Sequence, residues 1–371
     1  MLLVVLGAGA SNDFAGSLDI GDELRPPLTN ELVADSAANR KVLANLPQRA
    51  ASGLVAELRR RVASEKNLER ILDEIVSEDG DSTREMTAFR LYLQALLGRV
   101  SDEGVTSVGA VTNHAHLVRK IERWRRSHDA DNPVLYVTFN YDTILDQAIG
   151  SEYHWLKGGS APGLADYISS PVFKLIKLHG SVNWGHPTSV RTPWGLARAE
   201  AIHTYSDVPA IARSSIVEAA GRGELAIDAS EYRPMTGFGD AWNDWIETAA
   251  EGDFEHFRVP ALAVPLGSKA SYVCPQPHVN ALTDLLHSVD RILTIGWKAG
   301  EPDFVSQLET VRPGCLLKTV ARSQESRTRV AEILQSANSS IRYLEDDATT
   351  RPRAFSALLS GSTLFDFLTI D

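Results

Sequence analysis

Cysteine is scarce in this sequence of 371 residues, which contains only Cys274 and Cys315. Two cysteines supply neither a four-cysteine zinc site nor a disulfide framework, and such scarcity is typical of a reducing compartment. We therefore expect no zinc cofactor and a cytoplasmic location. Long apolar runs are also absent, since none approaches the roughly 18 residues of a membrane span. The apolar segment 1–6 lacks the basic start and the length of a signal peptide, so we interpret it as a strand.

A surplus of positive charge is the second feature that the sequence lacks. Its 37 Lys and Arg residues are outnumbered by 48 Asp and Glu residues, which gives a formal net charge of -11. Nucleic-acid-binding domains usually carry a basic footprint, so direct binding of nucleic acid is not expected. Arg123, Arg125 and Arg126 flank Trp124 near the end of a predicted helix. Cations complement a helix C-terminus, and we interpret this group as solvated.

Several catalytic and nucleotide-binding signatures are missing as well. The turn Gly7-Ala8-Gly9 has no third glycine, because Asn12 occupies that position, and no Walker-A lysine pattern accompanies it. ATP is therefore not expected at this turn. The sequence has no Gly-x-Ser-x-Gly elbow, so a serine hydrolase has little support. His114, His116 and His186 match no zinc-ligand spacing, and we expect them to be surface or capping residues.

What the chain does contain is an alternation of buried strands and amphipathic helices. With 43% hydrophobic residues it can bury a sizeable core. The alternation predicts an α/β fold, with a Rossmann-like, mostly parallel sheet and helices on both faces. The expected strands are 2–6, 134–138, 172–178, 261–265, 291–295, 316–320 and 341–344, and the expected helices are 114–126, 141–149, 278–288, 303–311 and 327–336.

Two insertions are expected to interrupt this core. The Rossmann-like core is assigned to residues 1–30, 128–185 and 259–371. Apolar residues at helical spacing, such as Leu54, Leu58 and Val62, indicate a helical insertion over 31–127. Residues 186–258 contain scattered Gly and Pro and an acidic amphipathic segment near 242–248. We interpret them as a second, irregular insertion or a lid.

Short polar motifs follow three of the expected core strands. They are the turn from Gly7 through Ala8 and Gly9 to Ser11, the segment that carries Asn140 and Asp142, and the pair His179-Gly180. The carboxyl ends of parallel strands share one crevice, where ligands bind in open α/β sheets. We therefore expect these motifs to line one pocket that suits a dinucleotide.

Each motif also contributes a chemistry of its own. Glycines permit a tight turn and close approach of the backbone to a pyrophosphate. An amide and a carboxylate can bind ribose hydroxyls, hold a water or stabilise positive charge on a sugar. An imidazole titrates near neutrality and can act as a base. After a later strand, Gly296, Trp297 and Asp303 can close over the ribose or adenine of the same ligand.

Ordinary structural roles stay open for the same residues. Gly7 and Gly9 can form a simple strand-to-helix turn. Asn140 can stabilise a turn, and Asp142 can cap the helix that follows it. Trp297 can be a core side chain, and a histidine at a strand end is often structural.

Taken in this order, the motifs resemble those of the sirtuin-like family of bacterial NAD-consuming proteins. Sirtuins carry a Gly-Ala-Gly turn, matched by Gly7-Ala8-Gly9, and a Gln-Asn-Ile-Asp segment, matched by Phe139-Asn140-Tyr141-Asp142. Their His-Gly pair, with the catalytic histidine, is matched by His179-Gly180. The strand-Gly motif and the later Asp-Phe of the bacterial branch are similar to 295–297 and 303–304. The resemblance covers roughly half the chain and implies His179, Asn140 and Asp142 as catalytic residues.

Two departures set the chain apart from protein deacylase sirtuins. Their four-cysteine zinc module is missing, and Asp13-Phe14 is followed by Ala15 where those enzymes have arginine. The resemblance to the bacterial defence branch instead implies an NAD glycohydrolase that depletes NAD during phage infection. NAD is then a substrate, and no zinc is required. The resemblance also implies a homo-oligomer or a HerA-like ATPase partner.

Cleavage of NAD releases nicotinamide as a neutral leaving group and gives C1′ oxocarbenium character. We expect Asp142 to stabilise that charge or hold the carboxamide, Asn140 to orient the ribose or the attacking water, and His179 to accept a proton. Two alternatives stay open. One is a non-catalytic module that senses NAD or ADP-ribose and controls a partner. The other is an NAD-dependent protein deacylase or ADP-ribosyl transferase, which consumes NAD only with an acceptor.

Overall fold

The structure is a computed structural model that describes residues 1–16, 18, 20–45, 49–65, 67–79, 84–154, 163–190, 216–223, 225–234, 257–265, 272–345 and 354–370. Its contacts divide the chain into two compact units. The first contains Met1–Pro26, Ser101–His179 and Cys274–Asp371, and the second contains Pro27–Val100 and Gly180–Val273. The acidic segment expected near 242–248 lies outside the described residues.

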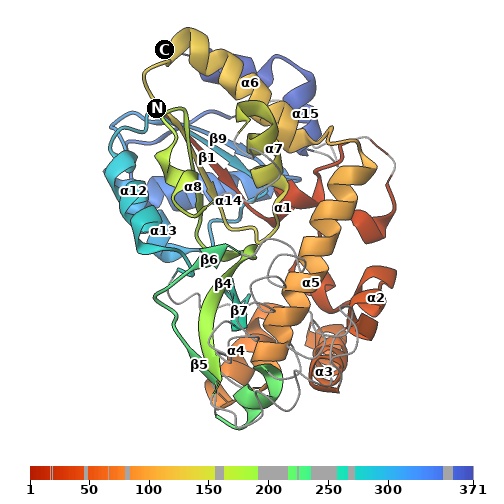
Figure 1. Ribbon diagram of the computed structural model, residues 1–371. Helices are drawn as coiled ribbons and strands as arrows, with labels where there is room; N and C mark the ends of the chain where they lie inside the picture. The colour runs from red at the N-terminus through yellow and green to blue at the C-terminus, as the bar shows by residue number, and fades with distance from the viewer. Residues whose placement is uncertain are drawn as a thin grey trace. The chain divides into compact units, whose positions relative to one another are not determined.

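A six-stranded parallel sheet forms the centre of the first unit (Figure 1). The strand order is β10-β9-β8-β1-β2-β3. Numbered along this unit and read from β3, the order is 3-2-1-4-5-6, the doubly wound Rossmann arrangement. The strands are β1 (Leu2–Leu6), β2 (Val134–Thr138), β3 (Phe173–Lys177), β8 (Arg291–Ile295), β9 (Leu316–Val320) and β10 (Arg342–Tyr343).

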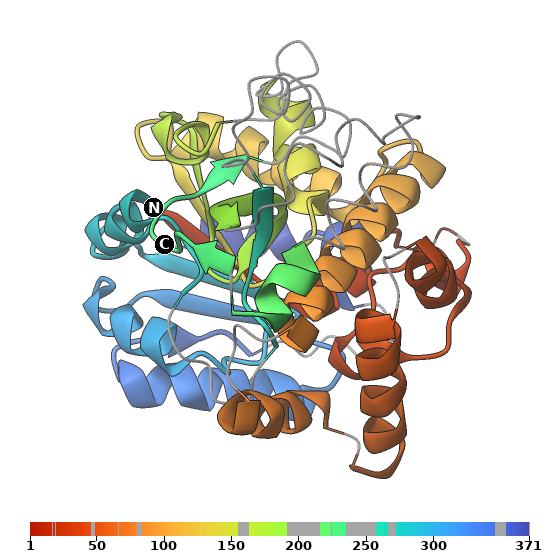
Figure 2. The ribbon, with the colours of Figure 1, turned by 60° about the horizontal axis from the view of Figure 1, so that its bottom comes forward.

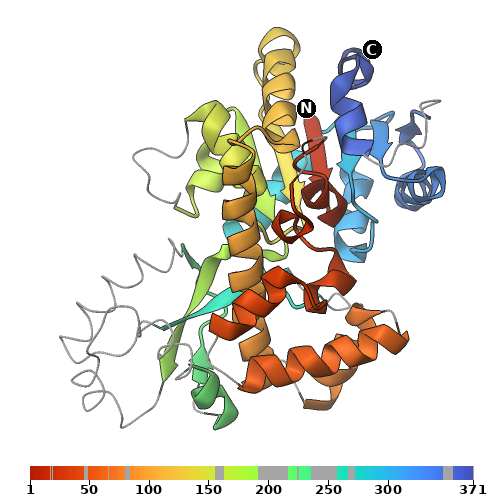
Figure 3. The same cartoon turned by 90° about the vertical axis from the view of Figure 1, so that its right-hand side faces the viewer.

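The sequence forms these strands because most of their residues are apolar, with Leu, Val and Ile prominent among them, and such runs favour a sheet that is covered on both faces. All five residues of β1 and all five of β2 are buried. Helices flank the sheet (Figures 1 and 3), which confirms the expected α/β, Rossmann-like class. The helices of this unit are α1 (Ala8–Asn12), η1 (Asp22–Leu24), α6 (Asn113–His128), α7 (Ile144–Tyr153), α8 (Asp166–Ser169), α12 (Gln276–Leu286), α13 (Pro302–Gln307), η4 (Leu308–Thr310), α14 (Gln324–Ala337), α15 (Ala354–Ser360) and α16 (Thr363–Thr369).

The second unit joins helices to an antiparallel sheet (Figures 1 and 2). Its long strand β4 (Gly180–Val190) pairs with β5 (Leu225–Ile227), β6 (Arg233–Pro234) and β7 (Phe257–Leu262). In β4, Val182 accepts a hydrogen bond from Gln94 at 2.9 Å. The helices are η2 (Thr29–Val33), α2 (Ala37–Asn45), α3 (Arg49–Glu65), α4 (Leu68–Asp79) and α5 (Arg84–Ser107), of which α5 continues into the first unit.

The observed division differs in detail from the three segments expected from the sequence. The helical segment 31–127 is split near Val100, because α6 and the end of α5 pack with the parallel sheet's unit. In that unit Phe14, Val105 and Ile144 share one apolar cluster. The described part of 186–258 shares a unit with the helices up to Val100.

One expected strand was wrong in its placement. Residues 261–265 were expected to resume the parallel core, but the strand there is β7, which pairs antiparallel with β4 in the second unit. A short apolar run does not reveal which strand it pairs with, and that pairing decides to which sheet the strand belongs. The C-terminal helices α15 and α16 were not expected. Among the described residues, no helix is both long enough and apolar enough to cross a membrane.

Candidate functional site

The carboxyl ends of four neighbouring strands in the first unit lie at one level. The register pairs Leu6 with Thr138 and with Ile295, and Thr138 with Lys177. Each site motif begins within two residues of these positions. With about 4.8 Å between neighbouring strands, β8 and β3 are roughly 14 Å apart at this edge. The order reverses between β1 and β8, so the edge is the switch point at which α/β proteins bind ligands.

Two glycine turns pack backbone against backbone at this switch point. Gly9 N donates to Gly296 O at 3.1 Å, and Gly7 N donates to Ile295 O at 3.0 Å. A Cβ on Gly7 would lie 2.6 Å from Gly296 O, and one on Gly296 would lie 2.3 Å from Ala10 N. Gly296 also has a φ of +60°, a conformation that favours glycine. Close approach of the two turns therefore accounts for these glycines before any ligand is considered.

The Asn140 side chain joins β2 to the glycine turn. Its amide Nδ2 donates to Gly7 O at 2.9 Å and to Ser11 Oγ at 2.8 Å. Both amide protons are thus committed to the turn, and Oδ1 is the atom that Asn140 can offer to a ligand. Ser11, which is buried, also hydrogen-bonds the Asp142 side chain. One serine hydroxyl therefore couples the amide to the carboxylate.

Asp142 is a buried carboxylate with a structural partner. Its Oδ1 accepts a hydrogen bond from Ile144 N at 3.1 Å, so it satisfies the first backbone N–H of α7, although the N-cap position itself is occupied by Thr143. Burial raises the pKa of Asp142, because the charged form loses solvation. The Ser11 hydroxyl and the charge of Lys177 oppose that shift by stabilising the anion.

Sequence reasoning missed a buried ion pair beside Asp142. Lys177 Nζ donates to the Asp142 carbonyl oxygen at 2.6 Å and to Asp146 Oδ2 at 2.8 Å. Tyr167 donates its hydroxyl proton to Asp146 Oδ1 at 2.7 Å. The Lys177 side chain has an exposed fraction of 0%. A lysine at the end of a buried strand is rare unless it is paired, and this was the signal in the sequence.

Aromatic rings connect the His179 end of the edge to the Gly296 end. The Phe139 ring packs edge-on against the His179 ring, with centroids 5.0 Å apart, and stacks on the Trp297 ring at 5.5 Å. The Tyr141 ring also stacks on the His179 ring, with centroids 6.2 Å apart. Trp297 is buried, and its Nε1 donates to Glu301 Oε2 at 2.6 Å. The imidazole therefore sits in an ordered aromatic setting.

The structure brings most of the predicted site residues to this edge. Asp303 is the exception, because its exposed side chain lies in the first turn of α13. Trp297 is a core side chain rather than an open platform. Glu301, which belongs to the same predicted segment as Asp303, is its buried acid. The residues that lie at the strand ends or in the turns after them are Gly7, Ala8, Gly9, Ser11, Asn140, Asp142, His179, Gly296 and Trp297.

Neither His114 nor the two cysteines belong to the motifs at the strand ends. In the part of the chain that the structure describes, no group of three or more His, Cys, Asp or Glu residues could hold a metal ion. His114 was expected at the surface or in a cap, but it is buried edge-on against Phe355, and burial lowers its pKa to about 3. Cys274 and Cys315 are free and buried.

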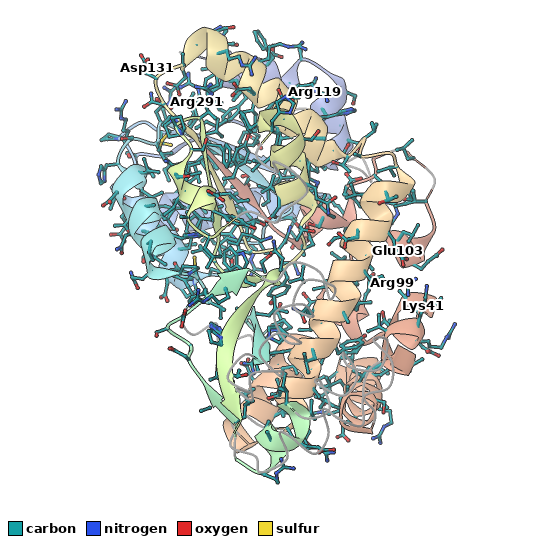
Figure 4. The ribbon with its side chains drawn as sticks, viewed as in Figure 1. Lys41, Arg99, Glu103, Arg119, Asp131 and Arg291 are labelled. Carbon is teal, nitrogen blue, oxygen red and sulfur yellow. The ribbon has the colours of Figure 1, made fainter. Side chains whose placement is uncertain are left out.

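The arginine group on α6 also differs from its expected solvated state. Arg125 is buried, and its Nε and Nη2 donate to the two oxygens of Glu122 at 2.7 and 3.0 Å. Glu122 also accepts hydrogen bonds from Arg126 and Tyr153. By contrast, Arg119 on the same helix has an exposed side chain (Figure 4). Ion pairing, which the sequence pattern did not reveal, buries this part of the group.

Together, the fold and the site define a doubly wound α/β protein with a polar, partly aromatic site at its switch point. No protein-family model matches the chain, and no curated protein matches it significantly. The resemblance to sirtuin-like proteins therefore rests on the motifs and their order.

Proposed function

We propose that the chain is an NAD glycohydrolase, which cleaves NAD to nicotinamide and ADP-ribose. The observation that carries the proposal is the common level of the strand ends, where β1, β2 and β3 are neighbours and their last residues are in register. The glycine turn, the Asn140–Asp142 segment and His179 begin within two residues of these strand ends. A dinucleotide lying across the switch point would meet all three.

The charge at the site supports cleavage of a cationic substrate. Nicotinamide in NAD is positively charged, and the sugar gains oxocarbenium character as it departs. Asp142 is a buried carboxylate, and the nearby Lys177 is already paired with Asp146. When Asp142 is ionised, its charge is thus incompletely neutralised and can stabilise positive charge in the transition state.

His179 is assigned the role of general base. An imidazole can accept a proton from a ribose hydroxyl or from the attacking water. Contacts with Phe139 and Tyr141 orient the ring. Asn140 would hold the glycine turn and present Oδ1 to a ribose hydroxyl. The pyrophosphate is assigned to the turn around the exposed Ala8.

The biological setting follows from the motif resemblance alone. We propose that NAD depletion serves anti-phage defence in the cytoplasm, with the chain acting as a homo-oligomer or beside a HerA-like ATPase. Incubation with NAD, with and without phage infection or candidate partners, would reveal activation as faster loss of NAD.

The test of catalysis compares two histidines of the first unit. Purified protein is incubated with NAD, and nicotinamide is measured by chromatography. His179→Ala is expected to reduce the rate about 10²–10⁴-fold, the usual contribution of general acid–base catalysis. His287→Ala, which removes an exposed histidine at the end of α12, should leave the rate unchanged. Normal turnover by a folded His179→Ala protein would refute the mechanism.

A second candidate is a non-catalytic module that binds NAD or ADP-ribose. The structural partners of Asn140 and Asp142 favour it, since both residues have a role without chemistry. This module would bind ADP-ribose in calorimetry but release no nicotinamide under any condition that activates the protein. A deacylase or transferase would instead consume NAD only when an acceptor is added.

A further inference from the structure

We propose that Lys177 and Asp146 are positioning residues, which hold Asp142 in place and leave its carboxylate incompletely neutralised for a cationic ligand. This inference rests on the proposed function, because it concerns how the same site treats a positively charged nicotinamide ribose. It adds two residues that the motif resemblance does not include. Both belong to the first unit: Lys177 is the last residue of β3, and Asp146 lies in the first turn of α7.

The contacts of Lys177 give it two separate tasks. Its bond to the Asp142 carbonyl oxygen, at 2.6 Å, fixes the backbone that carries the carboxylate. Its bond to Asp146 Oδ2, at 2.8 Å, pairs it with a different acid. Tyr167 occupies the second oxygen of Asp146 at 2.7 Å. Lys177 is therefore held between the segment that carries Asp142 and the helix α7.

The charges of the cluster sum to a surplus of one negative charge when all three groups are ionised. Lys177 and Asp146 compensate each other, and the charge of Asp142 remains. The groups that act on the Asp142 carboxylate are Ser11 from α1, Ile144 N and Asp146 from α7, and Lys177 from β3. Lys177 favours the ionised form of Asp142, and Asp146 disfavours it.

Removal of the cation and removal of the competing anion should therefore shift the titration midpoint of Asp142 in opposite directions. Lys177→Met removes the cation, so the Asp142 titration midpoint should rise by about one unit or more. Asp146→Asn removes the competing anion and leaves the whole charge of Lys177 to Asp142, so the midpoint should fall. The double variant K177M/D146N removes both effects, and its midpoint should lie between those of the single variants.

The matched control is Lys174→Met, on the same strand. Lys174 Nζ donates to Ile168 O at 2.6 Å and is only partly buried. It is not among the groups that act on Asp142. Its replacement should change neither the Asp142 midpoint nor turnover.

The experiment uses two readouts on the full chain. Carboxyl ¹³C NMR of aspartate-labelled protein follows the Asp142 titration without NAD, and Asp142→Asn assigns the signal. Nicotinamide release across pH then gives the acidic limb of activity. We expect the acidic limb to shift to higher pH in Lys177→Met and to lower pH in Asp146→Asn, in parallel with the NMR midpoints. Both single variants should also lower kcat more than they raise KM, because the backbone contact or its anchor is lost.

The outcomes separate this inference from the proposed function. If the wild-type protein releases no nicotinamide under any condition, the glycohydrolase fails, and the NMR midpoints still decide the inference. Midpoints that move together, or no more than in Lys174→Met, overturn it. If the single variants do not fold, the double variant decides. It removes both charges, and its full kcat with an unchanged Asp142 midpoint would overturn a positioning role, whereas a reduced kcat supports it.

Discussion

The close contact between the two glycine turns predicts a measurable pattern of stability. Gly296 combines a φ of +60° with a Cβ position 2.3 Å from Ala10 N. Two other glycines of the first unit separate these effects. A Cβ on Gly314, where φ is +78°, would meet nothing within 4 Å, whereas a Cβ on Gly7, where φ is not positive, would lie 2.6 Å from Gly296 O. Alanine at each position therefore isolates the conformation, the close approach or both.

The expected losses follow from the separate costs. A left-handed conformation costs a non-glycine residue about 1–2 kcal/mol, so Gly314→Ala should lower the free energy of unfolding by that amount. Overpacking costs about 1–3 kcal/mol, which is the loss expected for Gly7→Ala. Gly296→Ala carries both costs, and its loss should be about 2–5 kcal/mol. Its neighbour at 2.3 Å is backbone, which cannot move aside as a flexible side chain can.

Urea unfolding followed by circular dichroism measures these losses, with the four proteins compared in one buffer. The Gly296→Ala protein is expected to be less stable than both the Gly7→Ala and the Gly314→Ala proteins. A Gly296→Ala protein no less stable than Gly314→Ala would refute the backbone contact at the switch point. ADP-ribose binding by the Gly314→Ala protein should equal that of the wild type, because that turn lies before β9 at the opposite end from the site.

Two further predictions concern buried polar groups in the first unit. Trp297→Phe removes the indole donor to the Glu301 carboxylate and should lower the free energy of unfolding in urea by about 1.5–3 kcal/mol. The Nε1 atom of Trp124 has no hydrogen-bond partner among the described residues, so Trp124→Phe should cost less. Equal losses in the two variants would contradict the account. His114 has a pKa of about 3 in the fold, so its contribution to stability is complete above the unfolded pKa of about 6.5 and is lost as the pH falls toward 3. His114→Phe should therefore recover about 2 kcal/mol of the stability that the wild type loses between pH 7 and pH 5, and an unchanged loss in the variant would disprove the assignment.

Much of the first unit was predictable, because its strands carry a local signal. Residues 2–6, 134–138 and 291–295 are short apolar runs bounded by turns, and the structure forms strands with these bounds. The common edge was predictable too, since parallel strands that alternate with helices end on the same side. The position of His179 after β3 follows from that rule.

The contacts within the site were not predictable in the same way. The partner of Lys177 lies 31 residues away, and nothing local indicates that Asp146 faces it. Gly296 was expected to lie over a ribose, yet its nearest constraint is the backbone of the first turn. The strand β7 was misplaced for the same reason, since a run of apolar residues does not identify the strand with which it pairs. Partners distant in the sequence decide each case.

Structural and catalytic roles need not exclude each other at Asn140 and Asp142. Hydrogen bonds run from Gly7 O through Asn140 and Ser11 to Asp142. The backbone of Asp142 is held in turn by Lys177, which is paired with Asp146. Three neighbouring strand ends are thus ordered before any ligand binds. Electrostatic stabilisation of a transition state requires such preorganisation, because fixed groups need not reorient during the reaction. The contacts that favour a purely structural interpretation are therefore the same contacts that would make the site an effective catalyst.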